Sequence, residues 1–324
     1  MLDVDIETTR GPVAGRIRDE DIAIVRERST IDAVVGEHLQ LRNAGGGELK
    51  GLCPFHDEKT PSFHVAPARG VFHCFGCGEG GDVIDFVRKL EHLSFTEAIE
   101  HLAGRAGVEL HYEGGTASAR GSTGQRQRLV EAHVAAQAYY AERLHTDPEA
   151  SPGRTFLHER GFDESVATTY GVGFAPNSWE ALTKHLAGRG FTREELLAAG
   201  LVSQGQRGVI DRFRGRLMFP IADITGDIIG FGARKLLESD NGPKYLNTPE
   251  TPIYKKSHVL YGVDRAKREI ARRHQAVIVE GYTDVMACHL AGVPTAVATC
   301  GTSFGSDHIA VIRRLLMDQD EFRG

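Results

Sequence analysis

Apolar and polar positions near the start of the chain alternate between helical and strand spacing. Apolar residues recur every three or four positions over residues 17–38, which predicts two helices with a break near residues 28–30. Two short apolar runs, residues 63–65 and 71–73, flank a turn and predict a small antiparallel sheet. Helical spacing then returns, and Asp82 and Ser94 are suited to cap the two helices expected there, with Thr96 as an alternative to Ser94.

The pattern changes twice more along the chain. A long helix is expected over residues 127–144, followed by short helices and then by strands over residues 210–229 with a hairpin turn at residues 225–227. The continuous apolar runs 276–279 and 294–298 are typical of strands covered on both faces, and each precedes a helical segment. This order predicts a parallel sheet, so the fold class is α+β with several domains.

Composition indicates the cellular compartment and the position of a linker. Hydrophobic residues make up 41% and charged residues 25% of the 324 residues, as in ordinary globular proteins. No apolar run is long enough to span a membrane, and residues 1–15 read as a disordered leader without a signal-peptide pattern. Residues 113–125 are rich in Gly, Ser and Thr and predict a flexible linker. Cys288 and Cys300 lie in apolar segments and read as reduced thiols, which favours the cytoplasm.

Two short hooks carry the strongest chemical signal. Cys53 and His56 form one, Cys74 and Cys77 the other, and 17 residues separate the hooks in a chain with five cysteines. Three thiolates and one imidazole fill the tetrahedral shell of a zinc ion and leave no position open for chemistry. The pattern therefore predicts a structural zinc site, with a chance coincidence of the four residues as the alternative.

Two carboxylates follow the first apolar run of the predicted parallel sheet. Glu280 stands where the strand ends, at the edge where open α/β sheets bind ligands, and Asp284 falls in the first turn of the next helix. Such a pair suits Mg²⁺ or Mn²⁺ in phosphoryl chemistry. The alternative is that Glu280 merely ends a strand and that Asp284 favours a helix N-terminus.

Basic residues concentrate in the middle of an acidic chain. The net charge is −6, yet residues 207–273 hold 14 Lys or Arg against 8 Asp or Glu. Arg212, Arg214 and Arg216 alternate along an expected strand and would point to one face, where they would bind phosphates or form an ordinary exposed sheet face. The aromatic residues near the hooks fit a small core better than base stacking, although an exposed one would stack on unpaired bases; they are Phe55, Phe63, Phe72 and Phe75.

Taken in order, these segments resemble the bacterial replicative DNA primase family. The runs 51–63 and 72–78 look like its zinc-binding signature, and 212–220 and 243–247 are similar to motifs of its polymerase domain. The run 279–284 resembles the first motif of the toprim fold that topoisomerases share. A topoisomerase or recombination mediator is disfavoured, because the 212–220 segment does not belong to those proteins.

The resemblance implies a fold and a set of roles. It implies a zinc-ribbon domain at residues 16–112, a mixed α/β N-terminal subdomain of the polymerase domain at 126–258, and part of a toprim sheet at 259–324. Zinc would be held in a domain that reads the template start site, and Glu280, with Asp284 beside it, would be the metal-dependent acid or base. The side chains expected to line the template and nucleotide groove are Arg160, Arg212, Arg214, Arg216, Arg234, Lys244 and Lys256.

The same resemblance names an activity and partners. The activity is DNA-templated synthesis of short RNA primers on single-stranded DNA from ribonucleoside triphosphates. The protein is expected to act as a monomer, without a membrane, at replication forks in the nucleoid, with the replicative helicase bound by a C-terminal domain that this chain does not contain.

One departure concerns the catalytic metals. The family has a third toprim strand that ends in an Asp-x-Asp motif, whereas Asp318-Gln319-Asp320 follows a helical run here. We therefore expect a truncated chain with an incomplete Mg²⁺ or Mn²⁺ site, which is inactive as this fragment alone. The alternative function is a non-catalytic fragment that binds single-stranded template.

Overall fold

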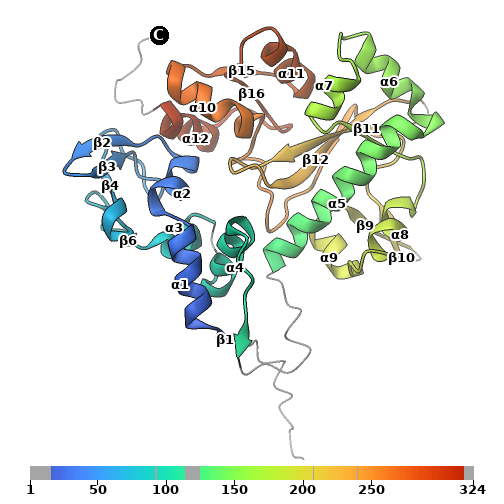
Figure 1. Ribbon diagram of the computed structural model, residues 1–324. Coiled ribbons are helices and arrows are strands. Elements are labelled where there is room, and N and C mark those ends of the chain that lie inside the picture. The colour runs from blue at the N-terminus through green and yellow to red at the C-terminus, as the bar shows by residue number, and fades with distance from the viewer. Residues whose placement is uncertain (1–15, 92, 114–124, 207, 239, 317–324) are drawn as a thin grey trace, which may run out of the picture.

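The computed structural model describes residues 16–91, 93–113, 125–206, 208–238 and 240–316. The predicted leader 1–15, nearly all of the predicted linker 113–125, and the Asp318-Gln319-Asp320 run lie outside the described residues. Figure 1 shows three parts, which we call the N-terminal region (16–113), the central region (125–258) and the C-terminal region (259–316). The N-terminal region, drawn in blue and cyan, lies beside the C-terminal region, drawn in orange and red.

The N-terminal region is a five-stranded antiparallel sheet, in the order β2-β3-β4-β5-β6, with four helices packed around it. Both predicted caps are confirmed: Asp82 and Ser94 each accept a hydrogen bond from the backbone N–H three residues on, in complete capping boxes. Its elements are β1 (Arg16–Ile17), α1 (Asp19–Arg28), α2 (Ile31–His38), β2 (Arg42–Gly45), β3 (Glu48–Gly51), β4 (Phe63–Ala66), η1 (Pro67–Arg69), β5 (Val71–Cys74), β6 (Gly80–Gly81), α3 (Val83–Leu90), α4 (Phe95–Ala106) and β7 (Tyr112–Glu113).

Aromatic rings form the core of this region. Phe63 and Phe72 are buried and stack at 5.1 Å between ring centroids, and Phe55 and Phe86 pack against both. Phe75 differs from them, because 71% of its surface is exposed. The expectation that most of these aromatic residues form a small core is confirmed.

In the central region, a long helix lies across a four-stranded sheet with the order β13-β12-β11-β8. The backbone of α5 passes so close to β8 that a Cβ on Gly173 would lie 2.6 Å from the Tyr140 backbone, so this strand position admits only glycine. The elements are α5 (Gln125–Thr146), η3 (Pro148–Ala150), α6 (Ser151–His158), α7 (Glu164–Thr169), β8 (Gly173–Ala175), α8 (Ala181–Ala187), α9 (Arg193–Ala198), β9 (Val202–Gly205), β10 (Gly208–Asp211), β11 (Arg216–Ala222), β12 (Ile228–Lys235) and β13 (Tyr245–Asn247).

The C-terminal region contains the predicted parallel pair. Val277–Val279 (β15) runs parallel to Ala296–Thr299 (β16), and the sheet order is β14-β16-β15. The expectation that the first run is covered on both faces is wrong for the described residues, because β15 has one strand neighbour and Ile278 is 40% exposed. The other elements are β14 (Leu260–Tyr261), α10 (Val263–Arg273), α11 (Tyr282–Leu290) and α12 (Ser306–Leu316).

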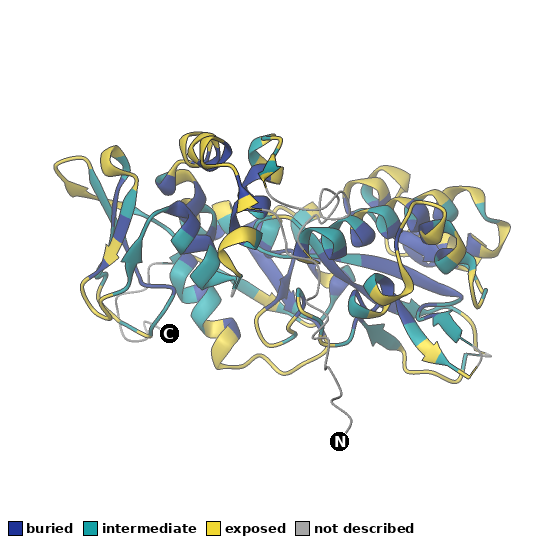
Figure 2. Ribbon diagram, turned by 90° about the horizontal axis from the view of Figure 1, so that it is seen from below, coloured by how far each residue is buried: buried dark blue, intermediate teal, exposed yellow. Residues whose placement is uncertain are grey.

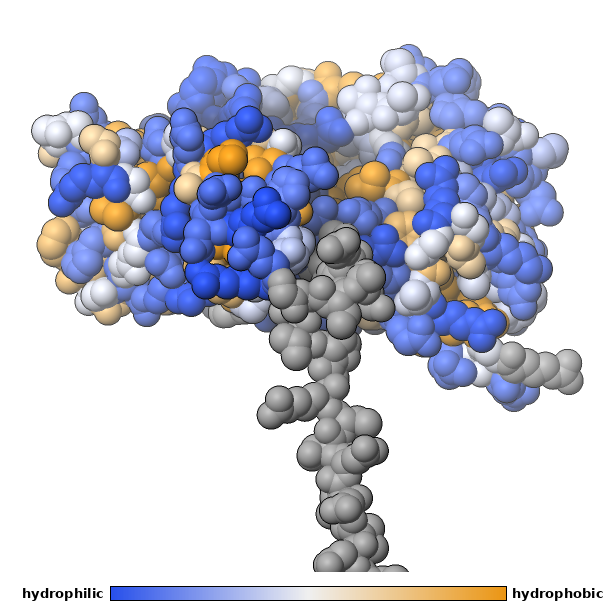
Figure 3. All heavy atoms as spheres, turned by 60° about the horizontal axis from the view of Figure 1, so that its bottom comes forward, coloured by the Kyte–Doolittle hydropathy of each residue, from blue (hydrophilic) through white to orange (hydrophobic). Residues whose placement is uncertain are grey.

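The apolar cores respect the boundary of the N-terminal region, whereas the central and C-terminal regions share one core cluster. The cluster that fills the N-terminal region contains only residues of that region, and the other three clusters contain none of them. In Figure 2 the buried residues lie in the interior, and the exposed residues lie on the outer helices and loops. In Figure 3, hydrophilic side chains cover most of one face and leave small, separated apolar patches. No described helix is both long and apolar enough to cross a membrane.

Candidate zinc centre and nucleic-acid interface

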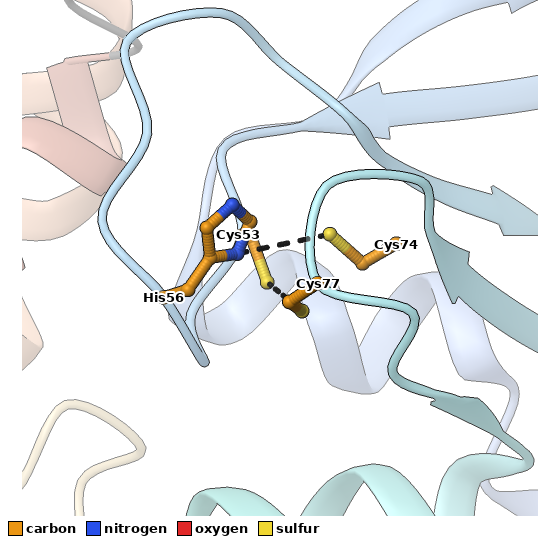
Figure 4. A group of neighbouring side chains, drawn as sticks. All are labelled: Cys53, His56, Cys74 and Cys77. Atoms are coloured by element: carbon orange, nitrogen blue, oxygen red, sulfur yellow. Dashed lines mark hydrogen bonds between the residues drawn. The ribbon is translucent and has the colours of Figure 1, made fainter.

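The two predicted hooks meet. Figure 4 shows Cys53 and His56 on the loop after β3, facing Cys74 and Cys77 at the end of β5. The four ligand atoms lie within 4.8 Å of one another, with 3.8 Å between the Sγ atoms of Cys53 and Cys77 and 3.8 Å between Cys74 Sγ and His56 Nδ1. Two thiolates on one tetrahedral zinc at about 2.3 Å lie about 3.8 Å apart, so the spacing fits zinc. The four residues form a structural zinc site.

A carboxylate and a hydroxyl behind the ligands orient them. Nε2 of His56 faces the Glu58 carboxylate at 3.4 Å, which leaves Nδ1 toward the thiolates. Glu58 also accepts from the backbone N–H of Cys53 at 2.6 Å and from the hydroxyl of Ser62. Ser62 in turn lies 3.2 Å from Cys74 Sγ. Such partners fix the tautomer and the direction of metal ligands. The sequence reasoning missed both residues, although they stand inside the 51–63 signature.

The two buried thiols have opposite pKa shifts, and the turn between them leaves no room for a side chain. Burial raises the pKa of the Cys53 thiol. Burial acts in the same direction on Cys74, yet the contact with the Ser62 hydroxyl and the backbone N–H groups of Cys77 and Gly76 lower the pKa of its thiol. A Cβ on Gly76 would lie 2.7 Å from both His56 Nε2 and Ser62 Oγ, so the hook admits no side chain there.

The predicted catalytic carboxylates lie at the end of β15. Glu280 directly follows the strand and Asp284 lies in the first turn of α11, and both are exposed. Among the described residues, His, Cys, Asp and Glu side chains gather in a group of three or more with metal-binding spacing at the zinc centre alone. Glu280 and Asp284 therefore have no third ligand within the described residues.

The expectation that three arginines share one strand face is wrong. β10 ends at Asp211 and β11 begins at Arg216, and Gly215 between them adopts φ +61°. This left-handed residue breaks the strand, so the alternation rule does not apply to Arg212 and Arg214.

Each of these arginines has its own environment. Arg216 is 3% exposed, forms an ion pair with Asp240 at 2.5 Å and donates to two backbone carbonyls. Arg214 lies over the ring of Trp179, with Cζ 4.1 Å from its centroid, and Trp179 is 60% exposed. Arg212 donates to the backbone carbonyl of Asn247 at 3.1 Å.

Other predicted cations gather around one ring. Arg160 and Arg234 lie over Phe156 with their Cζ atoms 3.6 Å and 3.7 Å from its centroid, so the structure brings this pair together. Lys244 is exposed, and Lys256 is partly buried with its backbone N–H bonded to Glu250. These contacts leave the role of the basic residues a prediction.

Asn247 joins Arg212, in the basic segment 207–273, to the turn at residues 280–284, which we call the carboxylate turn. Its carbonyl accepts from Arg212, its side-chain oxygen accepts from the Tyr282 hydroxyl at 2.9 Å, and its side-chain nitrogen donates to Cys300 O at 2.7 Å. The Tyr282 ring lies so close to β12 that a Cβ on Gly232 would approach it to 2.3 Å. Asn247 and Tyr282 stand in the runs 243–247 and 279–284 named above, but nothing in their spacing along the chain indicates the hydrogen bond between them.

Family models match most of the chain in the same order as these sites. The CHC2 zinc finger matches residues 17–118, the N-terminal domain of the DNA primase catalytic core matches 139–267, and the toprim domain matches 274–320. The DNA primase of Streptomyces coelicolor is 64% identical over 311 residues. The chain belongs to the DNA primase family.

The match to that primase covers 96% of this chain and 48% of the relative, so the chain spans about half the length of the curated primases it matches. Among solved structures, the RNA polymerase domain of the Mycobacterium tuberculosis primase, in complex with a double-stranded DNA oligomer with a 6-nucleotide overhang, is 57% identical. It covers 61% of this chain and 62% of that one, with a TM-score of 0.59. The zinc-binding and RNA polymerase domains of the Aquifex aeolicus primase are 35% identical over 89% of this chain and 68% of that one, with a TM-score of 0.54.

Proposed function

We propose that this chain carries the template-binding and polymerising parts of a primase, which makes short RNA primers on single-stranded DNA. The observation that carries the proposal is the Asn247 bridge between the basic segment and the turn that holds Glu280. Arg212 and the carboxylate turn thereby belong to one connected unit, as a polymerase needs if phosphates and the reacting groups are to meet. The M. tuberculosis domain solved with DNA supports a DNA partner.

The residues divide the work in the following way. Glu280 would act as the metal-dependent acid or base, with Asp284 beside it, and the basic residues named above would hold template and ribonucleoside triphosphates. Mg²⁺ or Mn²⁺ would neutralise charge on the triphosphate. Zinc has the separate role of folding the N-terminal domain. We propose domain limits of 16–112, 126–258 and 259–324. Monomeric action, the helicase and a place at the nucleoid remain predictions of the family resemblance.

Incorporation of labelled ribonucleotides on single-stranded template tests the catalytic role. Because Glu280 and Asp284 have no third ligand within the described residues, we expect little product from this chain with Mg²⁺ or Mn²⁺. The product that does form should fall on the order of 100-fold in Glu280→Gln, because a positioned acid or base contributes at least that much. Glu269→Gln is the matched control, since Glu269 pairs with Arg272 and Arg273 on the surface of α10. Equal losses in both variants would contradict a catalytic Glu280.

The alternative function, a non-catalytic template-binding fragment, is favoured by the outer face of the N-terminal sheet. Arg42, Lys50, His64 and His73 are paired in one cross-strand row. The exposed ring of Phe75 stands against both histidines, at 5.0 Å and 4.7 Å between centroids. An exposed ring beside two imidazoles, in a row that continues to Lys50 and Arg42, suits an unpaired base and its phosphate.

Fluorescence anisotropy with single-stranded DNA separates the two functions. Stacking of one base is worth about 1–3 kcal/mol, so Phe75→Ala should weaken binding roughly tenfold or more, whereas Phe95→Ala, which removes another exposed ring of the region, should not. Binding without incorporation under any metal condition favours the non-catalytic function. Absence of both activities excludes both functions for this chain.

A further inference from the structure

The N-terminal region docks on the rest of the molecule without a shared apolar core. No described core cluster crosses the boundary, and a cavity of about 360 Å³ lies between the two sides. Leu90 and Leu93 line it from the N-terminal region, and Ile224, Val259 and Val311 line it from the other side. Protein interiors are normally close-packed, so apolar packing across this boundary is incomplete. Polar contacts must then supply much of the specificity of docking.

Arg126, at the start of α5, is the centre of those contacts. It is 9% exposed and donates from Nη2 to Asp223 at 3.1 Å and from Nη1 to Asp227 at 3.0 Å, both in the β11–β12 turn. Across the boundary, Nη1 lies 3.1 Å from His101 Nδ1 on α4, and Nη2 lies 3.6 Å from Glu91 at the end of α3. One guanidinium therefore binds two regions at once.

The two sides of this cluster differ in rigidity. Asp223 Oδ1 accepts from the backbone N–H groups of residues 225, 226 and 227, so the turn holds Asp223 while its Oδ2 faces Arg126. Glu91 and His101 have no such clamp on their side chains within the described residues. Burial, followed by the Arg126 charge, lowers the pKa of His101 to about 4, so its neutral ring accepts from the guanidinium. The bonds that separate on undocking are those to Glu91 and His101.

Within the described residues, the other hydrogen bonds across the boundary are accepted by backbone carbonyls, and Lys267 and Arg314 also interact electrostatically with Glu37 and Asp57. The N–H of Gln40 donates to Arg314 O at 3.2 Å, its side chain donates to Ala271 O at 3.4 Å, and Lys267 reaches Glu37 O at 3.5 Å. None of these three contacts is a charge pair, and the two that exceed 3.3 Å are long for hydrogen bonds. The charges of the Arg126 cluster do not balance, because one cation faces three carboxylates. Burial also raises the pKa of Glu91. A contact of this kind holds a position and still separates at modest cost.

We propose that Arg126 is a reversible latch between the zinc-bearing N-terminal region and the polymerase half of the chain, by which we mean the central and C-terminal regions (125–316). Closed, the latch seats α4 against the β11–β12 turn. Open, it leaves Arg126 on its two aspartates and frees the N-terminal region to move the exposed ring of Phe75 relative to Glu280. The inference concerns docking alone and stands apart from the proposed catalysis.

Hydrogen exchange measured by mass spectrometry on the 324-residue chain tests the latch. Glu91→Gln removes the cross-boundary charge without touching the central region, and Arg126→Gln removes the centre. Both should speed exchange by roughly tenfold in peptides that cover α4 and residues 222–228. X-ray scattering should show a larger radius of gyration in both. The controls are Glu109→Gln, an exposed position in the same region, and Arg128→Gln, whose partners Glu195 and Gly190 are central.

The double variant Glu91→Gln/Arg126→Gln shows whether the effects of the two substitutions on hydrogen exchange are additive. If both residues act through one latch, the second substitution adds little to the first. Exchange that changes in residues 222–228 alone would show that Arg126 only braces the turn, and that result overturns the proposal, as does wild-type exchange in Glu91→Gln. If Arg126→Gln also speeds exchange throughout β11 and β12, that variant has lost structure in the central region. The exchange of Glu91→Gln alone then tests the latch.

Discussion

The zinc centre and the carboxylate turn are built on opposite plans. Four ligands from two hooks close the zinc shell, and Glu58 and Ser62 hold them from behind. At the turn, two exposed carboxylates have no third ligand in the described part of the chain, and their support comes from Asn247, which lies 35 residues away from Tyr282 in sequence. A closed site stabilises a fold, whereas an open one leaves room for substrate. Local spacing specifies the first, and long-range packing specifies the second.

The largest expected effect comes from breaking the closed site. Cys74→Ser should release zinc and unfold the N-terminal region, because zinc binding supplies on the order of 10 kcal/mol of folding free energy in small zinc domains. Circular dichroism and zinc analysis would record the loss. Cys288→Ser should keep both signals, since Cys288 lies far from the hooks in α11. A folded, zinc-free Cys74→Ser protein would contradict the structural role.

A smaller effect is expected where the central region supports the open site. Gly232→Ala would force a methyl group against the Tyr282 ring and should cost about 1–3 kcal/mol of unfolding free energy, as overpacking does. Gly188→Ala is the control, because its nearest contacts lie at 3.5 Å and its φ is −63°. Denaturant titration measures both. Equal stabilities would mean that β12 and α11 pack less closely than described.

The support behind the zinc ligands should have a graded effect. Glu58→Gln keeps the shape and removes the charge that faces His56, so zinc affinity should fall about 10- to 100-fold while the region still folds in excess zinc. Competition with a chromogenic chelator gives the affinity. Glu48→Gln, which faces Arg69 on the sheet surface, should leave the affinity unchanged. An unchanged affinity in Glu58→Gln would assign it no part in the zinc site.

Acid should weaken the N-terminal region through His38 and the central region through His133. Burial lowers the pKa of His38 to about 3 and that of His133 to about 4. Below about pH 6.5 the two histidines bind protons in the unfolded chain but not in the folded protein. The free energy of unfolding therefore falls by up to about 1.4 kcal/mol per pH unit for each histidine, until the pH reaches the pKa of that histidine in the folded protein. Unfolding of His133→Gln and His38→Gln between pH 7 and 5 should show a shallower slope than wild type. Identical slopes would show that neither ring is buried in its neutral form.

Sequence patterns predicted what depends on neighbours along the chain. The hooks, the capped helices after Asp82 and Ser94, and the β4–β5 hairpin all follow from spacing within a few residues, and all are confirmed. The parallel pairing of β15 and β16 is confirmed as well.

The failures arise where a local rule met a break or a distant partner. Alternation of Arg212, Arg214 and Arg216 assumed a continuous strand, and Gly215 in the left-handed region interrupts it. That glycine was the available signal. The exposure of Ile278 depends on which strand lies at the edge of the sheet, and the bond between Asn247 and Tyr282 depends on tertiary packing, neither of which spacing records.

The place of Trp179 offers a label-free test of the nucleic-acid binding proposed above. It is the single tryptophan of the chain, and its exposed ring lies under the Arg214 guanidinium in the basic segment. Its fluorescence therefore reports from one known point on the polymerase half. A strand of DNA that stacks on the ring or draws Arg214 away will quench or shift that emission, while DNA held only by the zinc-bearing region will leave it unchanged.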